Sequence, residues 1–534
     1  MTRCALQRVP ARSSPTPKTF FITTAIDYTN SAPHIGHAYE KVLADVIARY
    51  HRLKGDKVFF LTGVDQHGQK VQQSAAKEGV APEEFVRSTT LKFKDLWKKL
   101  EVEYDDWAET IDPRHKKVVQ GMLQRLFDQS QIYKDKQSGY YSVRQEQFLT
   151  DKERALDGEF GPEWGEVEFR EEENYYFKLE RHKQWLLDLI DKRSRTEKPF
   201  AIPDFRETEL RNAVERLFGD LCISRPKSRL SWGIELPFDR DYVNYVWFDA
   251  LSNYISFAGY DSTIDKYEDQ PKEFLEKWPA LQIIGKDILI PAHGIYWPIM
   301  LHALGFPDEA MPQLLVHGWW NLGGAKMSKS AGNIVDPDAL IDKYGAEALR
   351  YYLMSDIVSG KDADFSAERL IERYNADLAN SLGNLLNRTL NMAHRYRVGK
   401  VSGRGPGAIP HLSAYCTEME QSSIYAALER VNGFVVSCNQ QIELKQPWTL
   451  AKNASGAETL DSLLYQLSES LRIMAILISP ALPKAAHGIF DQLNWKMELS
   501  GKEERFSLTD AEWGKLPDGH VVGKPVPLFP RIEA

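Results

Sequence analysis

The sequence predicts an α/β fold, in which a parallel-sheet domain is split by an insertion and followed by a bundle of helices. Apolar runs typical of buried strands alternate with amphipathic helical patterns in residues 19–128 and 219–308, as in parallel sheets covered by helices. An acid-rich stretch, residues 129–218, lies between them. Beyond residue 366 leucines recur at helical spacing, so we expect residues 367–515 to form the bundle.

Composition and charge exclude several classes of protein. The 534 residues have 43% hydrophobic and 27% charged side chains, which is ordinary for a soluble globular protein of two or three domains. No run of about 18 apolar residues occurs, so a membrane span is not expected. The net charge of −8 argues against indiscriminate nucleic-acid binding, but it permits a local basic face.

The first chemical signature, Pro33-His34-Ile35-Gly36-His37, follows an apolar run at residues 20–26. Apolar residues at helical spacing predict that Gly36 opens an amphipathic helix. The amino end of a helix suits a phosphate, because its N–H groups are unpaired and its dipole is positive there. His34 and His37 share a face and can donate to one phosphate, while Gly36 lets a flat nucleobase approach the backbone. A helix start with two surface histidines is the alternative.

The second signature, Lys326-Met327-Ser328-Lys329-Ser330, lies about 290 residues further on. Gly323-Gly324 precedes it and Gly332 follows it, so we expect a mobile loop with permissive hinges. Two ammonium groups on such a loop can move onto a triphosphate and stabilise the charge that develops on departing pyrophosphate. A solvated basic loop is the usual fate of such a pattern. The ordered pair of signatures favours the nucleotide site.

In this order the two signatures resemble the HIGH and KMSKS motifs of class I aminoacyl-tRNA synthetases, and further blocks are similar to methionyl-tRNA synthetases. The resemblance extends over nearly the whole chain from about residue 19. It implies a Rossmann-like catalytic domain followed by an anticodon-binding helical bundle. The further blocks are Ala25-Ile26-Asp27-Tyr28-Thr29-Asn30, Leu61-Thr62-Gly63-Val64-Asp65-Gln66-His67-Gly68, Glu172-Glu173-Asn174-Tyr175-Tyr176-Phe177, Tyr245-Val246-Trp247-Phe248-Asp249-Ala250, Ile284-Gly285-Lys286-Asp287-Ile288 and Leu528-Phe529-Pro530-Arg531-Ile532-Glu533.

The resemblance implies a site for ATP, which would bring Mg²⁺ with it. The histidines would hold the phosphates, Gly36 the adenine and Asp287 the ribose, and the two motif lysines would neutralise the developing charge. The residues implied to be catalytic are His34, His37, Lys326 and Lys329. The residues implied to bind ATP are His34, Gly36, His37, Glu40, Gly285, Asp287, Lys326 and Lys329.

The resemblance also implies a methionine pocket whose aromatic rings contact the polarizable sulfur. Asp65 would hold the α-ammonium through a charge-assisted bond, and Arg225 would pair with Asp65 or with the substrate carboxylate. Tyr28 and His293 would donate weakly to the sulfur. The residues implied to bind methionine are Ile26, Tyr28, Asp65, Trp247, Ala250, Tyr254, His293 and Trp297.

The chain departs from the family pattern at two places in this pocket. Asp27 stands in the first block where the family usually has proline or another apolar or aromatic residue. The run from Asp287 to His293 is one residue longer than in the family, and it lacks the phenylalanine that usually precedes the histidine. The sequence leaves open how both departures affect the pocket.

The predicted bundle carries three residues that match the anticodon-reading positions of the family. Asn384 and Arg388 lie four residues apart on one helix and so share a face, which would hydrogen-bond to anticodon bases. Trp448 matches the residue that stacks on one of those bases. This chemistry suits a single-stranded loop, whose splayed bases are stacked on aromatic rings and read at their edges. A capped helix with a polar stripe is the alternative interpretation.

The four cysteines, Cys4, Cys222, Cys416 and Cys438, form no Cys-x-x-Cys pair. Many relatives carry zinc-binding cysteines in the insertion, but the equivalent residues 139–148 contain none. We therefore expect no zinc and no other protein-bound metal, and we expect the cysteines to be reduced rather than paired in disulfides.

The N-terminal eighteen residues contain four basic side chains and no acidic one, a composition that resembles a mitochondrial presequence. Compact members of the family without zinc also look like mitochondrial enzymes, so we expect the mitochondrial matrix. A basic tail on a cytoplasmic protein is the alternative.

The remaining segments complete the predicted organisation. Residues 309–366 hold the lysine loop and join the catalytic domain to the bundle, and residues 516–534 form a C-terminal tail. Some relatives continue into an extra tRNA-binding domain that makes them dimers. The sequence ends about where the bundle should end, so we expect a monomer.

The sequence thus predicts ATP-dependent activation of L-methionine to methionyl-adenylate and transfer of the methionyl group to the 3′ end of tRNA(Met). One alternative is a sister class I synthetase, which the methionine-type blocks and the lack of an editing insertion disfavour. The other is a non-catalytic tRNA-binding protein on the same fold. It is disfavoured because both nucleotide motifs, Asp65 and Trp247 are all present.

Overall fold

A seven-stranded sheet forms the centre of the molecule, which is known from a computed structural model. The structure describes residues 18–142, 147–149, 154, 157–327, 333–403, 412–495 and 506–533. Strands follow the order β2-β3-β1-β13-β14-β8, with β4 paired to β3. Every pairing in this sheet is parallel, so the predicted parallel α/β fold is confirmed. The strands are β1 (Thr19–Thr24), β2 (Asp27–Tyr28), β3 (Lys57–Asp65), β4 (Asp106–Glu109), β8 (Ala201–Ile202), β13 (Leu281–Gly285) and β14 (Gln313–His317).

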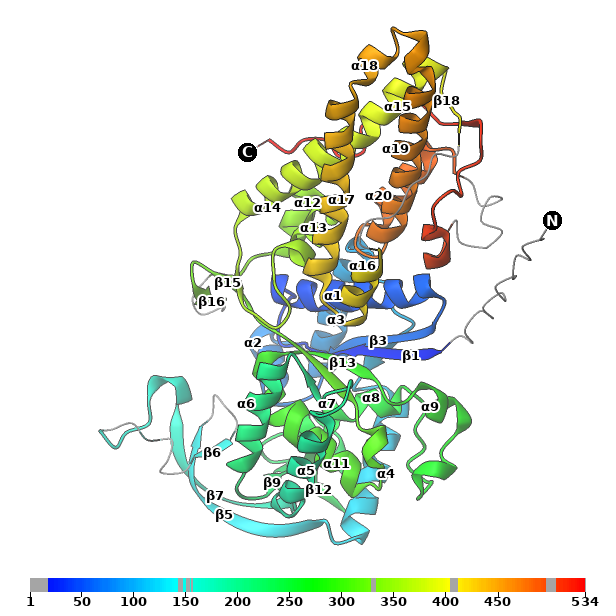
Figure 1. The fold of residues 1–534 in the computed structure, drawn as a ribbon. Coiled ribbons are helices and arrows are strands. Elements are labelled where there is room, and N and C mark those ends of the chain that lie inside the picture. The colour runs from blue at the N-terminus through cyan, green and yellow to red at the C-terminus, as the bar shows by residue number, and fades with distance from the viewer. Residues whose placement is uncertain are drawn as a thin grey trace, which may run out of the picture.

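The sheet separates two apolar cores, because successive residues of a strand point to opposite faces. Phe21 belongs to one core and Ile22 to the other, and Leu61 and Phe60 divide in the same way. Helix α1 (Ile35–Lys54), helix α13 (Ala346–Ser355) and the C-terminal bundle cover one face. Helices such as α4 (Pro113–Asp128) and α11 (Trp297–Ala303) cover the other (Figure 1).

The other elements around the sheet connect its strands. Helices α2 and α3 lie between β3 and β4, and the short helices α7 to α11 lie between the insertion and β14. Two small three-stranded sheets complete this part. The elements are α2 (Gln69–Glu78), α3 (Pro82–Lys99), α7 (Val246–Leu251), α8 (Asn253–Ser256), α9 (Lys272–Lys277), α10 (Lys286–Ile288), η5 (Leu289–Tyr296), α12 (Pro337–Tyr344), β10 (Ser224–Pro226), β11 (Glu235–Leu236), β12 (Asp239–Asn244), β15 (Trp320–Leu322), β16 (Ala325–Lys326) and β17 (Ala363–Asp364).

The insertion forms an antiparallel arm that projects from the sheet domain (Figure 1). Its boundaries differ from the expected 129–218. β8 lies within that range but pairs with β14 of the central sheet, whereas β9 lies beyond it and completes the arm. Both strands have only two residues, too few to give a recognisable apolar pattern. The elements are β5 (Ile132–Ser142), β6 (Gln147–Leu149), β7 (Val167–Phe177), α5 (Lys183–Arg193), α6 (Asp204–Glu215) and β9 (Leu221–Cys222).

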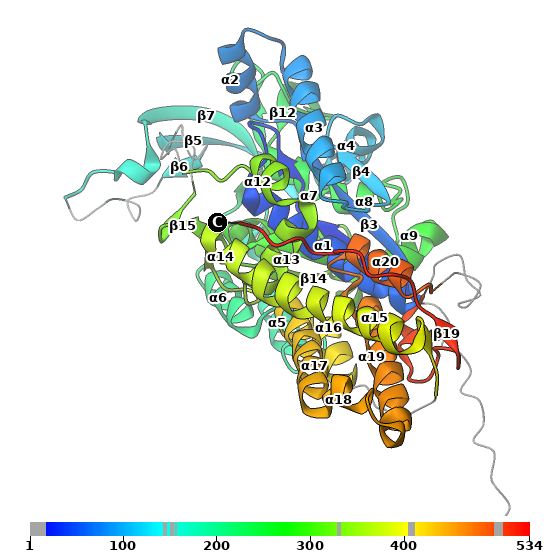
Figure 2. The same ribbon diagram turned by 90° about the horizontal axis from the view of Figure 1, so that it is seen from above.

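The predicted bundle of helices is confirmed, and it stands on helix α1 (Figure 1). α14, η7 and α15 follow one another without a break and form its first long helix. Seen from above, the C-terminal segment crosses the molecule from β19 towards α14 (Figure 2). There Asn375 exchanges two hydrogen bonds with the backbone of Ile532. The elements are α14 (Ala367–Arg373), η7 (Tyr374–Gly383), α15 (Asn384–Arg397), β18 (Lys400–Val401), α16 (Leu412–Glu420), α17 (Ile424–Lys445), α18 (Pro447–Leu450), α19 (Ala457–Ile478), α20 (Pro483–Gln492) and β19 (His520–Val521).

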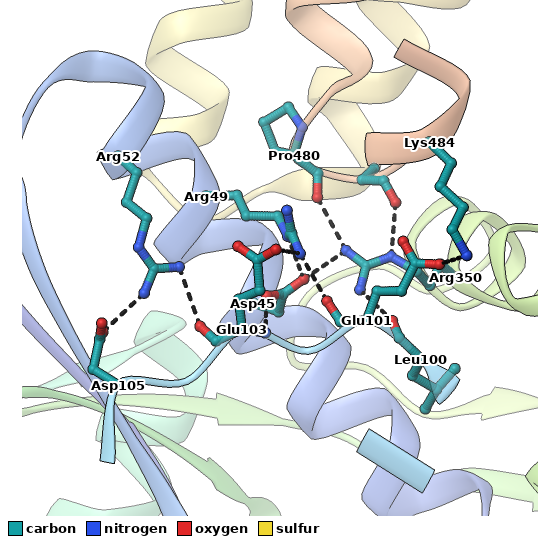
Figure 3. Close-up of polar contacts among 11 residues, drawn as sticks. Asp45, Arg49, Arg52, Leu100, Glu101, Glu103, Asp105, Arg350, Pro480 and Lys484 are labelled. Carbon is teal, nitrogen blue, oxygen red and sulfur yellow. Dashed lines mark hydrogen bonds and ion pairs between the residues drawn. The ribbon is translucent and has the colours of Figure 1, made fainter. Parts of the chain in front are cut away.

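A buried arginine joins the bundle to the sheet domain (Figure 3). Arg350 of α13 donates from Nη2 to Oδ2 of Asp45 on α1 at 2.7 Å, and from Nη1 to the Leu100 carbonyl at 2.9 Å. Its other donors bond to the carbonyls of Pro480 and Ala481, in the turn between α19 and α20, at 3.1 and 3.0 Å. We call this group the Arg350 joint. It ties α1 to the bundle through a guanidinium whose three nitrogens are all hydrogen-bonded.

No helix in the part of the chain that the structure describes is both long enough and apolar enough to cross a membrane.

Candidate active site

A cavity of about 550 Å³ opens at the carboxyl ends of β1, β3, β13 and β14, where parallel sheets usually bind their ligands. It brings together most of the residues predicted from the sequence. Lys329 lies outside the described residues. Trp297 does not line the cavity and packs behind Tyr254, at 5.9 Å between ring centres. The predicted residues that line it are Ile26, Tyr28, His34, Gly36, His37, Glu40, Asp65, Trp247, Ala250, Tyr254, Gly285, Asp287, His293 and Lys326.

The amino end of α1 forms one part of this cavity. The helix begins at Ile35, one residue earlier than predicted, and His34 caps it by accepting the Gly36 N–H at Nδ1, at 3.1 Å. Nδ1 of His37 accepts the His34 N–H at 3.1 Å, and the two rings lie 3.9 Å apart. A neutral ring that accepts at Nδ1 carries its proton on Nε2, so both histidines can donate towards the same group. A Cβ at Gly36 would lie 2.9 Å from the His34 ring, so the cap itself requires glycine.

The lysine loop reaches the opposite wall of the cavity. Nζ of Lys326 lies 3.7 Å from the centre of the Trp319 ring and 3.5 Å from Oδ2 of Asp287. The hairpin before it turns at Gly323 and Gly324, whose φ values of 62° and 75° are left-handed and favour glycine. Trp319 was not predicted from the sequence, although it follows the strand that leads into the loop. Its ring offers the ammonium a cation–π contact close to the adjacent carboxylate.

Aromatic side chains line the part of the cavity around Ile26, and the Asp65 and Asp27 carboxylates also line the cavity. Asp65 ends β3 and pairs in register with Tyr28 of β2. The hydroxyl of Tyr254 meets Nε2 of His293 at 2.7 Å, and Nδ1 of His293 lies 3.0 Å from the Ile288 carbonyl. Because a carbonyl only accepts, Nδ1 carries the proton and Nε2 accepts from Tyr254. Burial lowers the pKa of His293 to about 4, which keeps the ring neutral. The expected donation from His293 to a sulfur is therefore wrong for this arrangement, since both ring nitrogens are already engaged.

Comparisons with known proteins identify the family. Residues 20–159 and 164–390 match the family model described as tRNA synthetases class I (M). The methionine–tRNA ligases of Halalkalibacterium halodurans and Bacillus subtilis are each 39% identical to this chain over 97% of its length, and the matches cover 79% and 78% of those proteins. The chain belongs to the methionyl-tRNA synthetase family.

Solved structures of this family share the fold. A Mycobacterium tuberculosis methionyl-tRNA synthetase in complex with methionyl-adenylate is 35% identical, with a TM-score of 0.85. The match covers 96% of this chain and 100% of that one. The apo form of the same enzyme is 31% identical, with a TM-score of 0.82 over 97% and 99% of the two chains. The predicted family and fold are confirmed.

The active site of this methionyl-tRNA synthetase is braced by a buried carboxylate that was not predicted as a site residue. Oδ2 of Asp249 lies 2.6 Å from Nδ1 of His67, and Oδ1 lies 2.7 Å from Nε2 of His115. Although burial opposes the charge, the two histidines hold the pKa of Asp249 at about 2. The contact ties the loop after Asp65 to α7, which carries Trp247. His67 and Asp249 both lie in blocks that match the family, and that was the available signal.

The structure also places the two departures from the family pattern. The longer run before His293 forms the wide turns of η5, with a kink at Ile290 (φ −116°, ψ 123°), so the extra residue is taken up within a helical segment. The side chain of Asp27 points away from solvent and bonds to Lys41 of α1 at 2.7 Å. Arg225 donates to the Ser224 carbonyl and stacks 4.3 Å from the Tyr245 ring.

The residues predicted to read the anticodon lie at one end of the bundle of this synthetase. Asn384 is exposed at the start of α15. Arg388, one turn later, donates to Glu443 near the end of α17 at 2.6 Å. Trp448 follows on α18 with 42% of its surface exposed. The hydrogen bond from Arg388 on α15 to Glu443 on α17 therefore brings Asn384, Arg388 and Trp448 to the same region.

Proposed function

We propose that this methionyl-tRNA synthetase activates methionine with ATP and transfers the methionyl group to tRNA(Met). One observation carries the proposal: a single cavity joins the capped amino end of α1 and the lysine loop to an apolar, aromatic chamber with Asp65 at its wall. The relatives named methionine–tRNA ligase and the related structure that holds methionyl-adenylate support it.

In the proposed first step the methionine carboxylate attacks the α-phosphate of ATP. A bond forms between carboxylate oxygen and phosphorus, and the bond to pyrophosphate breaks. His34 and His37 would hold phosphate oxygens through Nε2–H donors, and Gly36 would allow close approach of the adenine. Asp287 would bind the ribose after releasing Lys326, which would turn from Trp319 towards the departing pyrophosphate. Positioning and charge stabilisation supply most of the rate in such chemistry.

In the proposed second step a hydroxyl of the 3′-terminal adenosine of tRNA attacks the methionyl carbonyl, and AMP leaves. Asp65 would hold the α-ammonium in both steps, with Tyr28, Trp247, Ala250 and Tyr254 around the side chain. No protein nucleophile is required. The methionyl group would therefore stay bound to Asp65 through its α-ammonium in both steps, while the leaving group is pyrophosphate in the first step and AMP in the second.

Mg²⁺ would neutralise phosphate charge when it arrives with ATP. Among the residues that the structure describes, no group of three or more His, Cys, Asp or Glu side chains could hold a metal ion. Mg²⁺ usually takes only one or two protein carboxylates beside the phosphates, and Asp287, which lines the cavity beside Lys326, would lie near the nucleotide. Absence of zinc remains an expectation from the sequence, as set out above.

ATP–pyrophosphate exchange with each of the twenty amino acids tests the proposal. Exchange with methionine alone is expected. Exchange with another amino acid would point to a sister synthetase, and silence from folded protein would favour the non-catalytic alternative. Lys326→Ala should lower the exchange rate about 100-fold, because it removes a donor to developing charge. Lys343→Ala, an exposed lysine of α12, is the matched control and should have no effect.

The anticodon assignment is tested by aminoacylation. Trp448→Ala should raise the KM for tRNA(Met) at least about fivefold, because stacking of one base contributes about 1–3 kcal/mol. Pyrophosphate exchange without tRNA should not change. Phe218→Ala removes an exposed aromatic ring outside the bundle and serves as control. Equal losses of activity in aminoacylation and in pyrophosphate exchange would contradict an anticodon role for Trp448.

We further propose that residues 1–18 direct the protein to the mitochondrial matrix. Residues 1–17 lie outside the described part, and the support is their basic, acid-free composition, whereas the relatives named above are bacterial. Fusion of residues 1–18 to a fluorescent protein tests the targeting, and diffuse cytoplasmic signal would refute it. A monomer is likewise proposed, to be checked by light scattering at several concentrations.

A further inference from the structure

Lys41 is a fully buried lysine of α1 that the proposed mechanism does not use. Its ammonium donates to Oδ1 of Asp27 at 2.7 Å, to Oε1 of Glu40 at 2.8 Å and to the Ala25 carbonyl at 2.9 Å. The side chain has no solvent exposure. Lysine is rarely buried unless it is paired, so these three acceptors define what holds it there.

Two of these acceptors flank Ile26, which lines the inner chamber. Ala25 precedes it and Asp27 follows it, so one ammonium holds the backbone on one side and a side chain on the other. Tyr28, the next chamber residue, is the last of the two-residue strand β2. Lys41 therefore contacts the segment that carries two of the residues proposed to bind methionine.

The third acceptor connects the same ammonium to the nucleotide end of the cavity. Oε2 of Glu40 lies 3.0 Å from Nε2 of His317, at the carboxyl end of β14. Glu40 follows His37 by one turn of α1. Lys41 thus sits between the methionine segment and the helix whose amino end is proposed to hold phosphate.

We propose that Lys41 is a positioning residue that fixes Ile26 and Tyr28 relative to helix α1, and so sets the affinity for methionine. The proposal rests on the proposed methionine activation. α1 has twenty residues, of which fifteen are buried, whereas β2 has two residues paired only with β3 in the described sheet. Loss of the ammonium should therefore shift the β2 segment and leave α1 in place.

This asymmetry predicts a selective effect on substrate binding. Lys41→Met keeps an unbranched side chain, shorter by one atom, and removes its charge. We expect the KM for methionine in pyrophosphate exchange to rise about tenfold and the KM for ATP to change less than twofold. Asp27→Ala leaves Lys41 paired with Glu40, so this variant should fold even if Lys41→Met does not. It should raise the KM for methionine about fivefold.

A double variant separates positioning from general stability. Asp27→Asn combined with Lys41→Met removes the Asp27 carboxylate along with the ammonium, while Glu40 keeps its contact with His317. If Lys41 only balances charge, this pair should restore both the melting temperature and the KM for methionine. If Lys41 positions the segment, the melting temperature recovers and the KM stays high.

The control is Arg472→Met, which breaks a buried ion pair with Glu469 in α19, a helix that contributes no residue to the cavity lining. It should lower the melting temperature without a change in either KM. Unchanged methionine affinity in both Asp27→Ala and Lys41→Met, or equal rises in both KM values, would overturn the proposal. Failure of the unmodified protein to exchange with methionine would instead refute the proposed function.

Discussion

Helix α1 carries two buried ion pairs one turn apart, and they differ in how fully their polar atoms are bonded. At the Arg350 joint, Oδ2 of Asp45 accepts from Arg350 and Arg49, and Oδ1 accepts the Glu103 N–H. In the ion pair of Lys41 with Asp27, one polar atom lacks a hydrogen-bond partner within the described part of the chain. Oδ2 of Asp27 is buried and has no hydrogen-bond partner among the described residues.

The incomplete pair lies at the active site and the complete pair lies at the boundary between sheet and bundle. A fully bonded buried network holds one arrangement, whereas an unpartnered buried oxygen is costly and is found where a site needs it. On the proposal above, one helix is anchored for stability at Asp45 and for substrate affinity at Lys41. The two pairs should respond differently to substitution and to pH.

The largest effect is expected at the joint. Arg350→Met removes the ion pair to Asp45 and leaves the carbonyls of Leu100, Pro480 and Ala481 without their donor. The free energy of unfolding in urea should fall by about 3–5 kcal/mol, because one partner of a buried pair is deleted. The KM for methionine should stay within twofold of the parent value. A large rise in that KM in folded Arg350→Met would abolish the distinction between the two pairs.

The next effect is a pH dependence that belongs to the active-site pair alone. Burial, and then the nearby Glu40 carboxylate, raise the pKa of Asp27 to about 7 against the attraction of Lys41; its ordinary value is 3.8. Glu40 shares the same ammonium, but Lys41 and His317 outweigh its burial and lower its pKa. Burial, together with the Glu40 and Asp27 charges, raises the pKa of Tyr254 well above its ordinary value, so its hydroxyl stays neutral beside this cluster.

A carboxyl with a raised pKa stabilises the fold below its unfolded pKa, and this contribution is lost as pH rises through about 7. Between pH 5 and pH 8 the parent should therefore lose about 3 kcal/mol relative to Asp27→Asn, since the two pH units from 5 to the folded pKa of about 7 each correspond to about 1.4 kcal/mol. Urea unfolding at both pH values measures the difference. If the free energy of unfolding changed equally in parent and variant between pH 5 and pH 8, Asp27 would not titrate in this window.

The smallest effect is expected at a third ion pair of α1, on the surface. Arg52 bonds to Asp105 at 2.8 Å and to the Glu103 carbonyl at 3.1 Å, with both side chains partly exposed (Figure 3). Arg52→Ala should cost about 0.5 kcal/mol or less, and the cost should shrink in 1 M salt. A loss as large as that of Arg350→Met would mean that burial is not what separates these pairs.

The sequence was sufficient to predict the family, the parallel sheet, the bundle of helices and most of the residues that line the cavity. His34, His37 and Lys326 were accessible because each lies in a short motif whose chemistry depends on neighbouring residues. Trp297 was predicted to bind methionine by alignment alone, and the structure places it one layer behind Tyr254. Sequence position does not distinguish a ring that lines a cavity from the ring that supports it.

The residues that were missed act through contacts between distant segments. In the sequence, Lys41 and Arg350 look like ordinary surface residues of amphipathic helices. They are buried only because the helices that carry them pack against the bundle and β2. The strand β8 was missed for a different reason: two residues carry no periodicity. Such features are set by tertiary contacts that a local pattern does not contain.

The Arg350 joint has a consequence for protein engineering. Chimeras that exchange anticodon bundles between synthetases, in order to recode which tRNA is charged, would naturally be joined near residue 367. That junction keeps Arg350 with the catalytic half and replaces the turn at Pro480 and Ala481 that accepts its hydrogen bonds. A transferable bundle therefore includes α13 and a matched carboxylate on α1, so the exchangeable unit is larger than the domain boundary suggests.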